Sequence, residues 1–591
     1  MSASTAQRDP MEINVGIIGV GVVGSAVLDF FARGPIEVPV PGARFSEPSV
    51  AKVRIWSAAR RSRNTPKGAS EAFIQRLVTH DERGQPRYYY DSGPNEPQGN
   101  TLGPAWREIV RDPDVDIVVE LTGSPVAEGI IEQALWHGKC VVTANKGVLS
   151  RSGYELVRLA QSRGTALAYE ACVGGGMPVV QTIGAAIGGR VTALLAIING
   201  TTNYILTEMQ KAVAPDPHLS GSARGTLPQT GEGKSGDAST AYPAAVCAAI
   251  HGGLAEADPS ADVLGEDARA KVIILAGLAF GMRLRPLDVY VRGIARRGVS
   301  KAPPASKRAA HHACPGAKRP CPDICGNEDH VNTQPIFHAP DLQVLQRLGY
   351  VPKLLAGAQL VTGLGPGERA VAWVQPAAVP ATHALALVTG SENACLLDVE
   401  SPVDGGKDPH PPRSESGRPL PQTGEAGAKR YSILLRGPGA GGPETASSVI
   451  ADIQFCARQI AAARVGGDIG REDGQRVPMY MYGANAFREA IDYPGVPSLC
   501  MSDRLVAPFL LRFLTSGSDG AKLAKSLAGC GVEAEALEGV KGYVYLKTAP
   551  VSVRVVERAI ESVLLAQGAG RMPLDVLYLP IIEGARWEER D

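Results

Sequence analysis

The sequence predicts an α/β protein of three parts: a doubly wound domain with a parallel sheet, an α+β domain and a small C-terminal domain of ferredoxin-like order. Three patterns carry this prediction. Residues 12–33 read as a strand, a glycine turn and a helix. Short apolar strands then alternate with helices as far as residue 173, which is typical of a parallel sheet with helices on both faces. Residues 508–582 read as strand, helix, two strands, helix and strand, the βαββαβ order.

The composition limits the class of protein. A chain of 591 residues is too long for one ordinary core, so we expect two to four domains. Lysine plus arginine and aspartate plus glutamate both number 60, so the charge gives no reason to expect nucleic acid or an anionic membrane as partner. The ten cysteines are scattered, and neither a signal or transit peptide nor a membrane-spanning apolar run is evident. We therefore expect a reduced, cytoplasmic protein.

A G-x-G-x-x-G motif lies directly after the first strand and opens the first helix. Its glycines are Gly19, Gly21 and Gly24, with Val22 and Val23 before the last. In such motifs the first glycine permits a tight turn, the second lets a pyrophosphate approach the backbone, and the third lets helix and strand pack closely. The helix N-terminus then faces the anion. The motif and its context predict that these five residues bind a dinucleotide.

Basic residues follow the second strand, at a place where NAD-binding domains carry an acidic residue for the ribose 2′-hydroxyl. The segment 58–63 reads AARRSR. Arg60 and Arg61 suit the 2′-phosphate of NADP. A solvated basic loop is the alternative interpretation, so we expect NADP as the cofactor and keep NAD open.

Three stretches interrupt the regular pattern, at about 211–240, 299–339 and 401–429. Each is rich in proline, glycine, serine and charge and lacks apolar periodicity, which is typical of inserts without regular structure. The second contains histidines and cysteines at 311–330. Their spacing matches no regular zinc module, so incidental side chains are favoured over a metal site.

Ionisable residues gather around the start of an apolar helix. Asp267 and Lys271 are four positions apart, which places both on one helix face. Glu256 and Asp262 precede them, and crowded carboxylates suit a substrate ammonium group and the tuning of a lysine. A surface ion pair is the alternative. Lys146 ends a strand at the carboxyl edge of the predicted parallel sheet, where ligands bind in such folds.

Several ordered segments together carry a family resemblance. They are DIVVELTG at 116–123, VVTANKG at 141–147, YEACVGGGMP at 169–178, INGTTNYI at 198–205, GLAEADPSADVLGEDARAKVIILA at 253–276 and RGPGAGGPETASSVIADI at 436–453. In this order and spacing they resemble the homoserine dehydrogenase family, over nearly all of residues 13–465 apart from the inserts. The resemblance implies an NAD(P)-dependent oxidoreductase that interconverts L-homoserine and L-aspartate 4-semialdehyde, in threonine, methionine and isoleucine biosynthesis.

The resemblance also assigns roles to the ionisable residues. Lys271 matches the proton-transferring lysine and Asp267 its partner. Lys146 matches a lysine beside the nicotinamide and the substrate. Glu256 and Asp262 match residues that hold the amino group of homoserine.

Further matched positions concern ligands and domain limits. Gly200 and Thr201 match positions that contact substrate, and Thr122 and Gly441 match positions that line the cofactor. The implied organisation is a Rossmann domain at 12–150 completed by 430–465, a catalytic domain at 151–430, and a C-terminal domain at 496–591.

The segment YEACVGGGMP matches the position of a monovalent cation, of the sodium type, in the family. The matching ligands are Glu170 and the backbone carbonyls of Val173, Gly175 and Met177. Glycines allow carbonyl groups to converge on an ion, but the same glycines suit a simple tight turn.

The C-terminal region resembles an ACT domain, a small amino-acid-sensing module. The usual Asp-x-Pro-Gly turn is replaced by Ser516–Gly520, which has no proline. A looser turn loses more entropy on ordering. We therefore expect weak or absent inhibition by threonine and a role for this domain in assembly, as a homodimer or homotetramer.

Two other functions stay open from the sequence. One is a related NAD(P) dehydrogenase acting on another amino-acid aldehyde, and the other is a non-catalytic amino-acid sensor. The presence of Lys146, Glu256, Asp267 and Lys271 argues against the sensor. No kinase-sized segment precedes residue 12, so we do not expect a fusion with aspartate kinase.

Overall fold

The computed structural model describes most of the chain between residues 11 and 582. The described ranges are 11–40, 50–60, 68–90, 104–213, 241–256, 258–297, 333–361, 369–401, 430–439, 441–466, 506–514, 520–540, 543–566 and 577–582. Some predicted features lie outside these ranges: Arg61, most of the three inserts with the histidines and cysteines at 311–330, and the turn before Gly520.

The first sheet contains seven strands of the described residues and runs in the order β2-β3-β1-β5-β6-β7, with β4 beside β3. Their bounds are β1 Met11–Ile18, β2 Ile36–Pro39, β3 Val50–Arg60, β4 Tyr88–Tyr90, β5 Ile117–Glu120, β6 Cys140–Thr143 and β7 Leu167–Ala168. Every pairing is parallel except that of β2 with β3. Strands such as β5 and β6 are buried along their whole length, as expected when helices cover both faces of a parallel sheet. The predicted α/β fold with a Rossmann-like sheet is confirmed.

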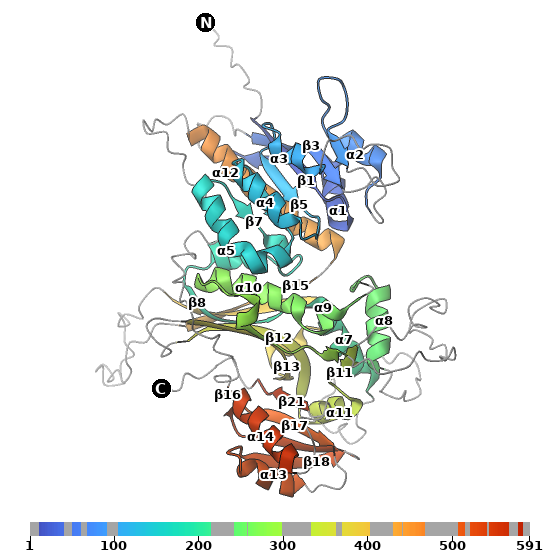
Figure 1. Cartoon of the computed structure of the whole chain (residues 1–591), viewed down its shortest axis with the longest axis vertical. Helices are drawn as coiled ribbons and strands as arrows, with labels where there is room; N and C mark the ends of the chain where they lie inside the picture. Colours follow the sequence, from blue (N-terminus) through green and yellow to red (C-terminus); the bar gives the residue numbers. More distant parts are fainter. Residues whose placement is uncertain are drawn as a thin grey trace, which may run out of the picture.

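A helix from much later in the chain completes this part of the molecule. The earlier helices are α1 Val22–Phe31, α2 Glu71–Leu77, α3 Trp106–Arg111, α4 Ala127–Trp136 and α5 Lys146–Arg163. Helix α12, Gly442–Gly466, packs on α1 and on strands of the first sheet, so it lies among the early elements in Figure 1. Arg464, near its end, forms an ion pair with Asp116 and donates to the Glu12 carbonyl at 2.8 Å. Helix α12 therefore belongs to the first part of the molecule.

The second sheet is mixed and has six strands within the described residues, in the order β15-β14-β8-β12-β13-β9. Their bounds are β8 Arg190–Ile197, β9 Val289–Val291, β12 Tyr350–Val361, β13 Arg369–Pro380, β14 Glu392–Glu400 and β15 Arg430–Pro438. Only the pairing of β13 with β9 is parallel. Helix α10, Glu266–Phe280, packs against β8, β12 and β13 and also against α5 of the first part. Helix α9, Ser260–Val263, contacts both α10 and α7, Gly200–Ala212, and α7 packs on α8, Ala241–His251.

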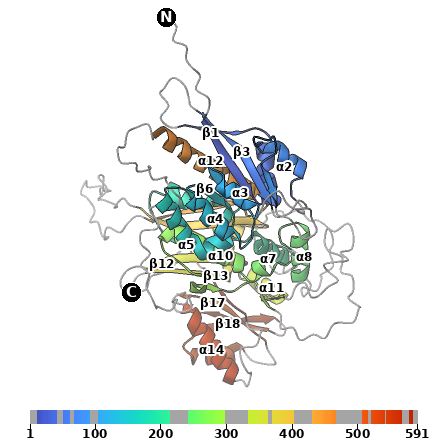
Figure 2. The same ribbon diagram turned by 45° about the horizontal axis from the view of Figure 1, so that its top comes forward.

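The C-terminal part confirms the predicted βαββαβ order. Its elements are β17 Phe509–Leu514, α13 Gly520–Ala528, β18 Ala534–Val540, β19 Tyr543–Thr548, α14 Val553–Ala566 and β21 Leu577–Pro580, with the short pair β16 Val506–Ala507 and β20 Val551–Ser552 beside them. The four main strands form an antiparallel sheet in the order β18-β19-β17-β21. Leu355 and Trp373 of the second sheet share one apolar core with Phe509, Leu511 and Leu546. The second sheet therefore lies between the first part and the C-terminal part (Figures 1 and 2).

The element boundaries differ from the predicted domain limits at several points. The first sheet extends beyond residue 150, because β7 pairs with β6. The segment 430–438 belongs to the second sheet, because β15 pairs with β14, so the return to the first part begins at 442. Two predicted inserts are also shorter: α7 includes 211–212, and β11 (Thr333–Pro335), which pairs with β10 (Ala295–Arg297), is followed by α11 (Ala339–Arg347). Apolar periodicity does not reveal such short strands.

None of the helices in the described part of the chain combines the length and the apolar character that crossing a membrane requires.

Candidate active site

Two lysines from different helices meet one carboxylate where the first part contacts the second. Asp267 lies in the first turn of α10, with Lys271 one turn later and Lys146 at the start of α5. Lys146 Nζ lies 2.6 Å from Asp267 Oδ1, and Lys271 Nζ lies 2.8 Å from Asp267 Oδ2. The side chains of Asp267 and Lys271 are 6% and 11% exposed, whereas that of Lys146 is 44% exposed. This lysine–aspartate cluster is therefore closed at α10 and open to solvent at Lys146.

Asp267 stays ionised because two lysines pair with its carboxylate, not because water hydrates it. Burial opposes ionisation of this carboxyl group, but Lys271 and Lys146 outweigh it and hold the pKa of Asp267 well below its usual range. In return, Asp267 raises the pKa of Lys146 against the effect of burial. The cluster thus brings the amino groups of two lysines onto one carboxylate.

The turn before α7 completes the surroundings of Lys271. The Ile198 carbonyl accepts a hydrogen bond from Lys271 Nζ at 2.8 Å. The next residue, Asn199, donates from Nδ2 to Asp262 Oδ1 at 2.7 Å and to Asp267 Oδ2 at 2.8 Å. The sequence analysis missed both residues. Asn199 could have been noticed as the residue of the NGTTN segment best suited to cap α7.

The predicted substrate positions Gly200 and Thr201 form the start of α7. A Cβ on Gly200 would lie 2.6 Å from the Ser391 carbonyl oxygen, so only glycine fits without a shift of the backbone. Thr201 Oγ1 donates to the Leu254 carbonyl at 2.9 Å. This bond ties the predicted substrate turn to the segment that leads to Glu256.

The two predicted substrate carboxylates differ in their surroundings. Asp262 lies on α9, and burial followed by the negative charge of Asp267 raises the pKa of Asp262. Glu256 lies between α8 and α9 and is exposed. Among the described residues, the hydrogen bonds and ion pairs of the lysine–aspartate cluster extend to Asp262 but do not include Glu256.

The glycine loop has the geometry that a dinucleotide requires. Gly19 has φ +100°, and a Cβ there would lie 2.6 Å from the Leu121 carbonyl carbon. A Cβ on Gly24 would lie 2.2 Å from the Gly19 oxygen, whereas a Cβ on Gly21 would meet nothing within 4 Å. The first and third glycines thus serve the close packing of strand, turn and helix, and space for an anion lies beside the second.

Two further segments adjoin the glycine loop. A Cβ on Gly442 would lie 2.7 Å from Val22 Cγ1, so the start of α12 and its neighbour Gly441 lie beside the loop. Glu120 is fully buried at the end of β5 and accepts from Thr122 N at 2.7 Å, Thr122 Oγ1 at 2.6 Å and Thr143 Oγ1 at 2.8 Å. Glu120 therefore holds together the ends of β5 and β6. The sequence analysis missed it, although a charged residue ending the apolar strand IVVE was visible.

Arg60 lies at the carboxyl end of β3 but is only 5% exposed. One guanidinium nitrogen donates to the Ala69 carbonyl at 3.1 Å, and its Cζ lies 5.4 Å from the centre of the Tyr88 ring. These contacts hold Arg60 at the carboxyl end of β3, within the strand and not in a solvated loop.

The predicted cation turn is built around a buried carboxyl group. Glu170 accepts from the backbone nitrogens of Val180 at 3.0 Å and Gln181 at 2.7 Å, and burial raises its pKa to about 7. The Gly175 carbonyl accepts from Ser448 Oγ at 2.5 Å, and the Met177 carbonyl accepts from Val179 N at 2.8 Å. Val173 and Met177 are also buried, so the turn is enclosed under α12.

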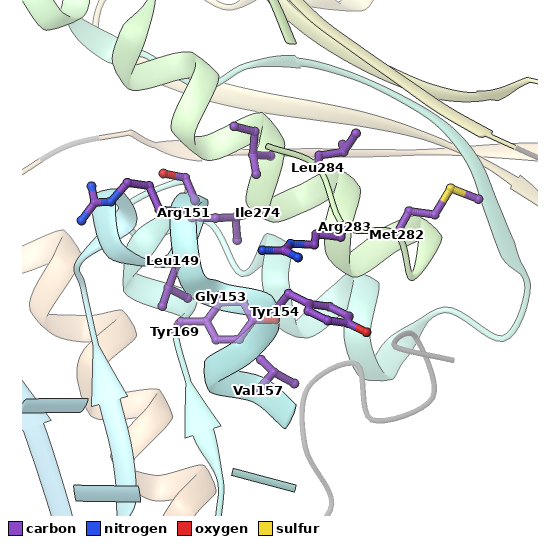
Figure 3. A pocket seen from close by; sticks show the side chains of 13 residues that line it. Leu149, Arg151, Gly153, Tyr154, Val157, Tyr169, Ile274, Met282, Arg283 and Leu284 are labelled. Atoms are coloured by element: carbon purple, nitrogen blue, oxygen red, sulfur yellow. The ribbon is translucent and has the colours of Figure 1, made fainter. Parts of the chain in front are cut away.

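A separate cavity lies between α5 and α10 (Figure 3). Leu149 and Tyr154 line it from α5, and Ile274 lines it from α10. At its edge Arg283 pairs with Glu155 and lies over the Tyr154 ring, 5.7 Å from its centre. None of the three residues of the lysine–aspartate cluster lines this cavity.

Comparison with known proteins decides the family. A family model described as "Homoserine dehydrogenase, NAD binding domain" matches residues 19–170, and one described as "Homoserine dehydrogenase" matches 178–401. The chain is 32% identical over 400 residues to homoserine dehydrogenase of Mycobacterium leprae, covering 66% of this chain and 68% of that protein. The chain belongs to the homoserine dehydrogenase family. Another homoserine dehydrogenase, from Synechocystis, is 30% identical over 445 residues, covering 75% of this chain and 73% of that protein.

Solved structures of homoserine dehydrogenases share the fold. That from Thiobacillus denitrificans superposes with a TM-score of 0.63 at 24% identity, covering 97% of this chain and 99% of that one. That from Staphylococcus aureus gives a TM-score of 0.54 at 19% identity, with the same coverage. The family membership identifies the activity as NAD(P)-dependent homoserine dehydrogenase. Of the three functions that the sequence left open, it selects the interconversion of L-homoserine and L-aspartate 4-semialdehyde.

Proposed function

We propose that the lysine–aspartate cluster is the catalytic centre of this homoserine dehydrogenase and that Lys271 transfers the proton. The observation that carries the proposal is that Lys271 and Lys146 bind the two oxygens of one buried carboxylate, Asp267, where α5 and α10 meet. A carboxylate shared in this way holds each ammonium group in a defined place. Because only Lys146 is widely exposed, the substrate oxygen enters from its side.

This arrangement also assigns the group that transfers the proton. Bound NAD(P) accepts or supplies the hydride at C4 of its nicotinamide ring. In the oxidising direction Lys271, as a neutral amine, takes the hydroxyl proton of homoserine, directly or through water, and becomes an ammonium group. In the reducing direction its ammonium group polarises the aldehyde and returns the proton. Asp267 orients both lysines throughout, and Lys146 adds positive charge beside the reacting oxygen.

We propose that the carboxylates of α9 and of the segment before it hold the substrate ammonium group. Asp262 is fixed by Asn199 through Oδ1, so its other oxygen is the one we assign to the substrate. Glu256 is exposed and nearby in the chain, and we assign it a second, more solvated contact. Gly200 and Thr201 line the same site from the start of α7.

For the cofactor, we propose that the glycine loop, Val22, Val23, Thr122 and Gly441 line the dinucleotide. We further propose a preference for NADP, with Arg60 and Arg61 at the 2′-phosphate. The position of Arg60 at the carboxyl end of β3 supports this assignment, because that is where the ribose lies in such folds.

We propose a monovalent cation of the sodium type at the turn of Glu170. The residues present fit such an ion: a buried carboxyl group accepts only backbone N–H groups in the described contacts, so a cation would balance its charge. The Gly175 and Met177 carbonyls each accept one hydrogen bond, which leaves one lone pair of each for an ion. The Val173 carbonyl would complete the set.

We propose three domains, with the C-terminal part an ACT-like domain that serves assembly as a homodimer or homotetramer. Its core is continuous with that of the second sheet, which supports a structural role. Threonine is the candidate effector, and we expect weak or absent inhibition. Strong threonine inhibition would show that the sensor function is intact.

A steady-state assay tests the proposed function. The full chain is given aspartate semialdehyde with NADPH or NADH, and we expect turnover with both and a lower KM for NADPH. Lys271→Ala, assayed in parallel, should abolish most of this turnover. Unchanged turnover in that variant would refute the proposed catalytic centre.

A further inference from the structure

Both polar atoms of the Asn199 side chain form hydrogen bonds inside the site. Its Nδ2 donates to Asp262 Oδ1 at 2.7 Å and to Asp267 Oδ2 at 2.8 Å, while its Oδ1 accepts from Thr202 N at 2.8 Å. The residue is 4% exposed. Two carboxylates face one end of the amide and a backbone N–H faces the other, so only one orientation of the amide satisfies all three partners.

We propose that Asn199 is a positioning residue that fixes the two carboxylates of the active site relative to each other and keeps both available as anions. The inference rests on the proposed catalytic centre. Through one N–H of its amide Asn199 holds Oδ1 of Asp262, which leaves the other oxygen of Asp262 for the substrate ammonium group. Through the other N–H it fixes Asp267 Oδ2, the oxygen that also receives Lys271.

The need for such a residue follows from electrostatics. Asp262 is a buried carboxyl group facing the negative charge of Asp267, and both effects raise its pKa. Three groups act in the opposite direction: the hydrogen bond from Asn199, and the charges of Lys271 and Lys146. A neutral donor between two anions stabilises both charges without adding a third charge to the site. An ammonium group in the same place would compete with the substrate.

The backbone of the same turn reinforces the arrangement. Asn199 caps α7, and the carbonyl of the preceding residue, Ile198, accepts from Lys271 Nζ at 2.8 Å. The cap fixes the turn, and the turn fixes this carbonyl. Asn199 therefore positions Asp262 and Asp267 directly and Lys271 through the Ile198 carbonyl. These three residues belong to two different helices.

Replacement by aspartate separates this role from helix capping. Aspartate caps helices as well as asparagine does, so Asn199→Asp should retain α7, but it cannot donate to either carboxylate and it adds a negative charge. Loss of a hydrogen bond to a charged group predicts a fall in kcat/KM for homoserine of about ten- to a hundredfold, most of it in KM. The KM for the cofactor should stay unchanged. Because the pKa of Asp262 rises further, the acidic limb of the kcat/KM profile should move to higher pH.

Two further variants complete the test. Asn199→Ser retains a capping oxygen and one donor, so its defect should be intermediate. Ser552→Ala removes a cap from α14, where Ser552 Oγ accepts from Val555 N at 3.4 Å, and it should lower the melting temperature without moving the pH profile. Wild-type kcat/KM and pH profile in both Asn199 variants would overturn the inference. Such wild-type behaviour of the Asn199 variants would leave the proposed catalytic centre intact as long as Lys271→Ala is inactive. An active Lys271→Ala would refute the catalytic centre itself.

Discussion

Lys146 Nζ lies 2.6 Å from Asp267 Oδ1, although the two residues belong to different parts of the molecule. Lys146 begins the helix that follows β6 of the first sheet, and Asp267 lies in the first turn of the helix that covers the second sheet. Under the proposed function, this ion pair joins the part that binds the cofactor to the part that binds the substrate. Hydride transfer requires the two ligands to meet, which supports our proposal that the reaction takes place at this contact.

Replacement of Lys271 by alanine should lower kcat by about a hundredfold or more, because a proton-transferring group contributes roughly 10²–10⁴-fold. Cofactor affinity should stay nearly unchanged, since the glycine loop is not touched. Steady-state kinetics and a cofactor titration measure the two effects. Lys211→Ala, which removes an exposed lysine paired with Glu208, is the matched control. Near-wild-type turnover in Lys271→Ala would contradict the assignment.

The substrate carboxylates should affect KM more than kcat. Glu256→Gln and Asp262→Asn each remove a charge that we assign to the ammonium group of homoserine, and such a loss raises KM with little change in kcat. Asp262→Asn should have the larger effect, about ten- to a hundredfold, because Asp262 is buried and Glu256 is exposed. An unchanged KM for homoserine in either variant would count against that residue.

Joint replacement of Arg60 and Arg61 by alanine should weaken NADPH by about 1–3 kcal/mol, the value of charge-assisted bonds to a phosphate. NADH lacks that phosphate, so the affinity for NADH should not change. The comparison needs KM for both cofactors at two salt concentrations, because the NADPH value should rise with salt. Equal losses for NADPH and NADH would show instead that Arg60 supports the fold through Ala69 and Tyr88.

A buried ion pair links α11 to the C-terminal sheet. Asp341 pairs with Arg512 and accepts from Tyr545 OH at 2.8 Å, and both members of the ion pair are almost completely buried. Asp341→Asn leaves the guanidinium group buried without this carboxylate, which should lower the free energy of unfolding by about 3–5 kcal/mol. Urea unfolding measures the change, and adding Arg512→Met should recover part of it. A loss below about 1 kcal/mol, typical of a surface pair, would contradict the prediction.

Lys353 should make stability depend on alkaline pH. It is buried beneath α7, where Nζ donates to Asn203 Oδ1 at 2.9 Å, and burial lowers its pKa from 10.5 to about 8. The folded state therefore releases this proton at lower pH than the unfolded state does. Between the two pKa values the unfolded state binds more protons, so the free energy of unfolding rises with pH.

The test compares wild type with Lys353→Met in urea unfolding between pH 7 and 10. Above pH 8 the free energy of unfolding of the wild type should rise, relative to that of the variant, by up to about 1.4 kcal/mol per pH unit. Lys211→Met, at an exposed position, should run parallel to the wild type. Parallel curves for Lys353→Met as well would mean that Lys353 titrates like an exposed lysine.

Much of this protein could be inferred from local patterns. The glycine motif, the strand–helix alternation and the βαββαβ order follow from residues close together in the chain, because backbone geometry and apolar periodicity are local properties. The pairing of Asp267 with Lys271 belongs to the same class, since one turn of helix separates them. The resemblance to homoserine dehydrogenases singled out Lys146, Asp262 and Glu256 as further site residues.

Contacts between distant segments could not be inferred in this way. The meeting of Lys146 with Asp267, the two bonds of Asn199 and the burial of Glu120 between β5 and β6 all depend on how separate elements pack. Strand β15 joined the second sheet and not the first, because pairing partners and not propensity decide where a strand belongs. The tertiary structure also shows that Arg60 is buried, whereas the alternative interpretation of the sequence was a solvated basic loop. Buried polar groups find their hydrogen-bond partners on segments that are distant in the chain and meet only in the folded protein, so no single segment reveals these partners.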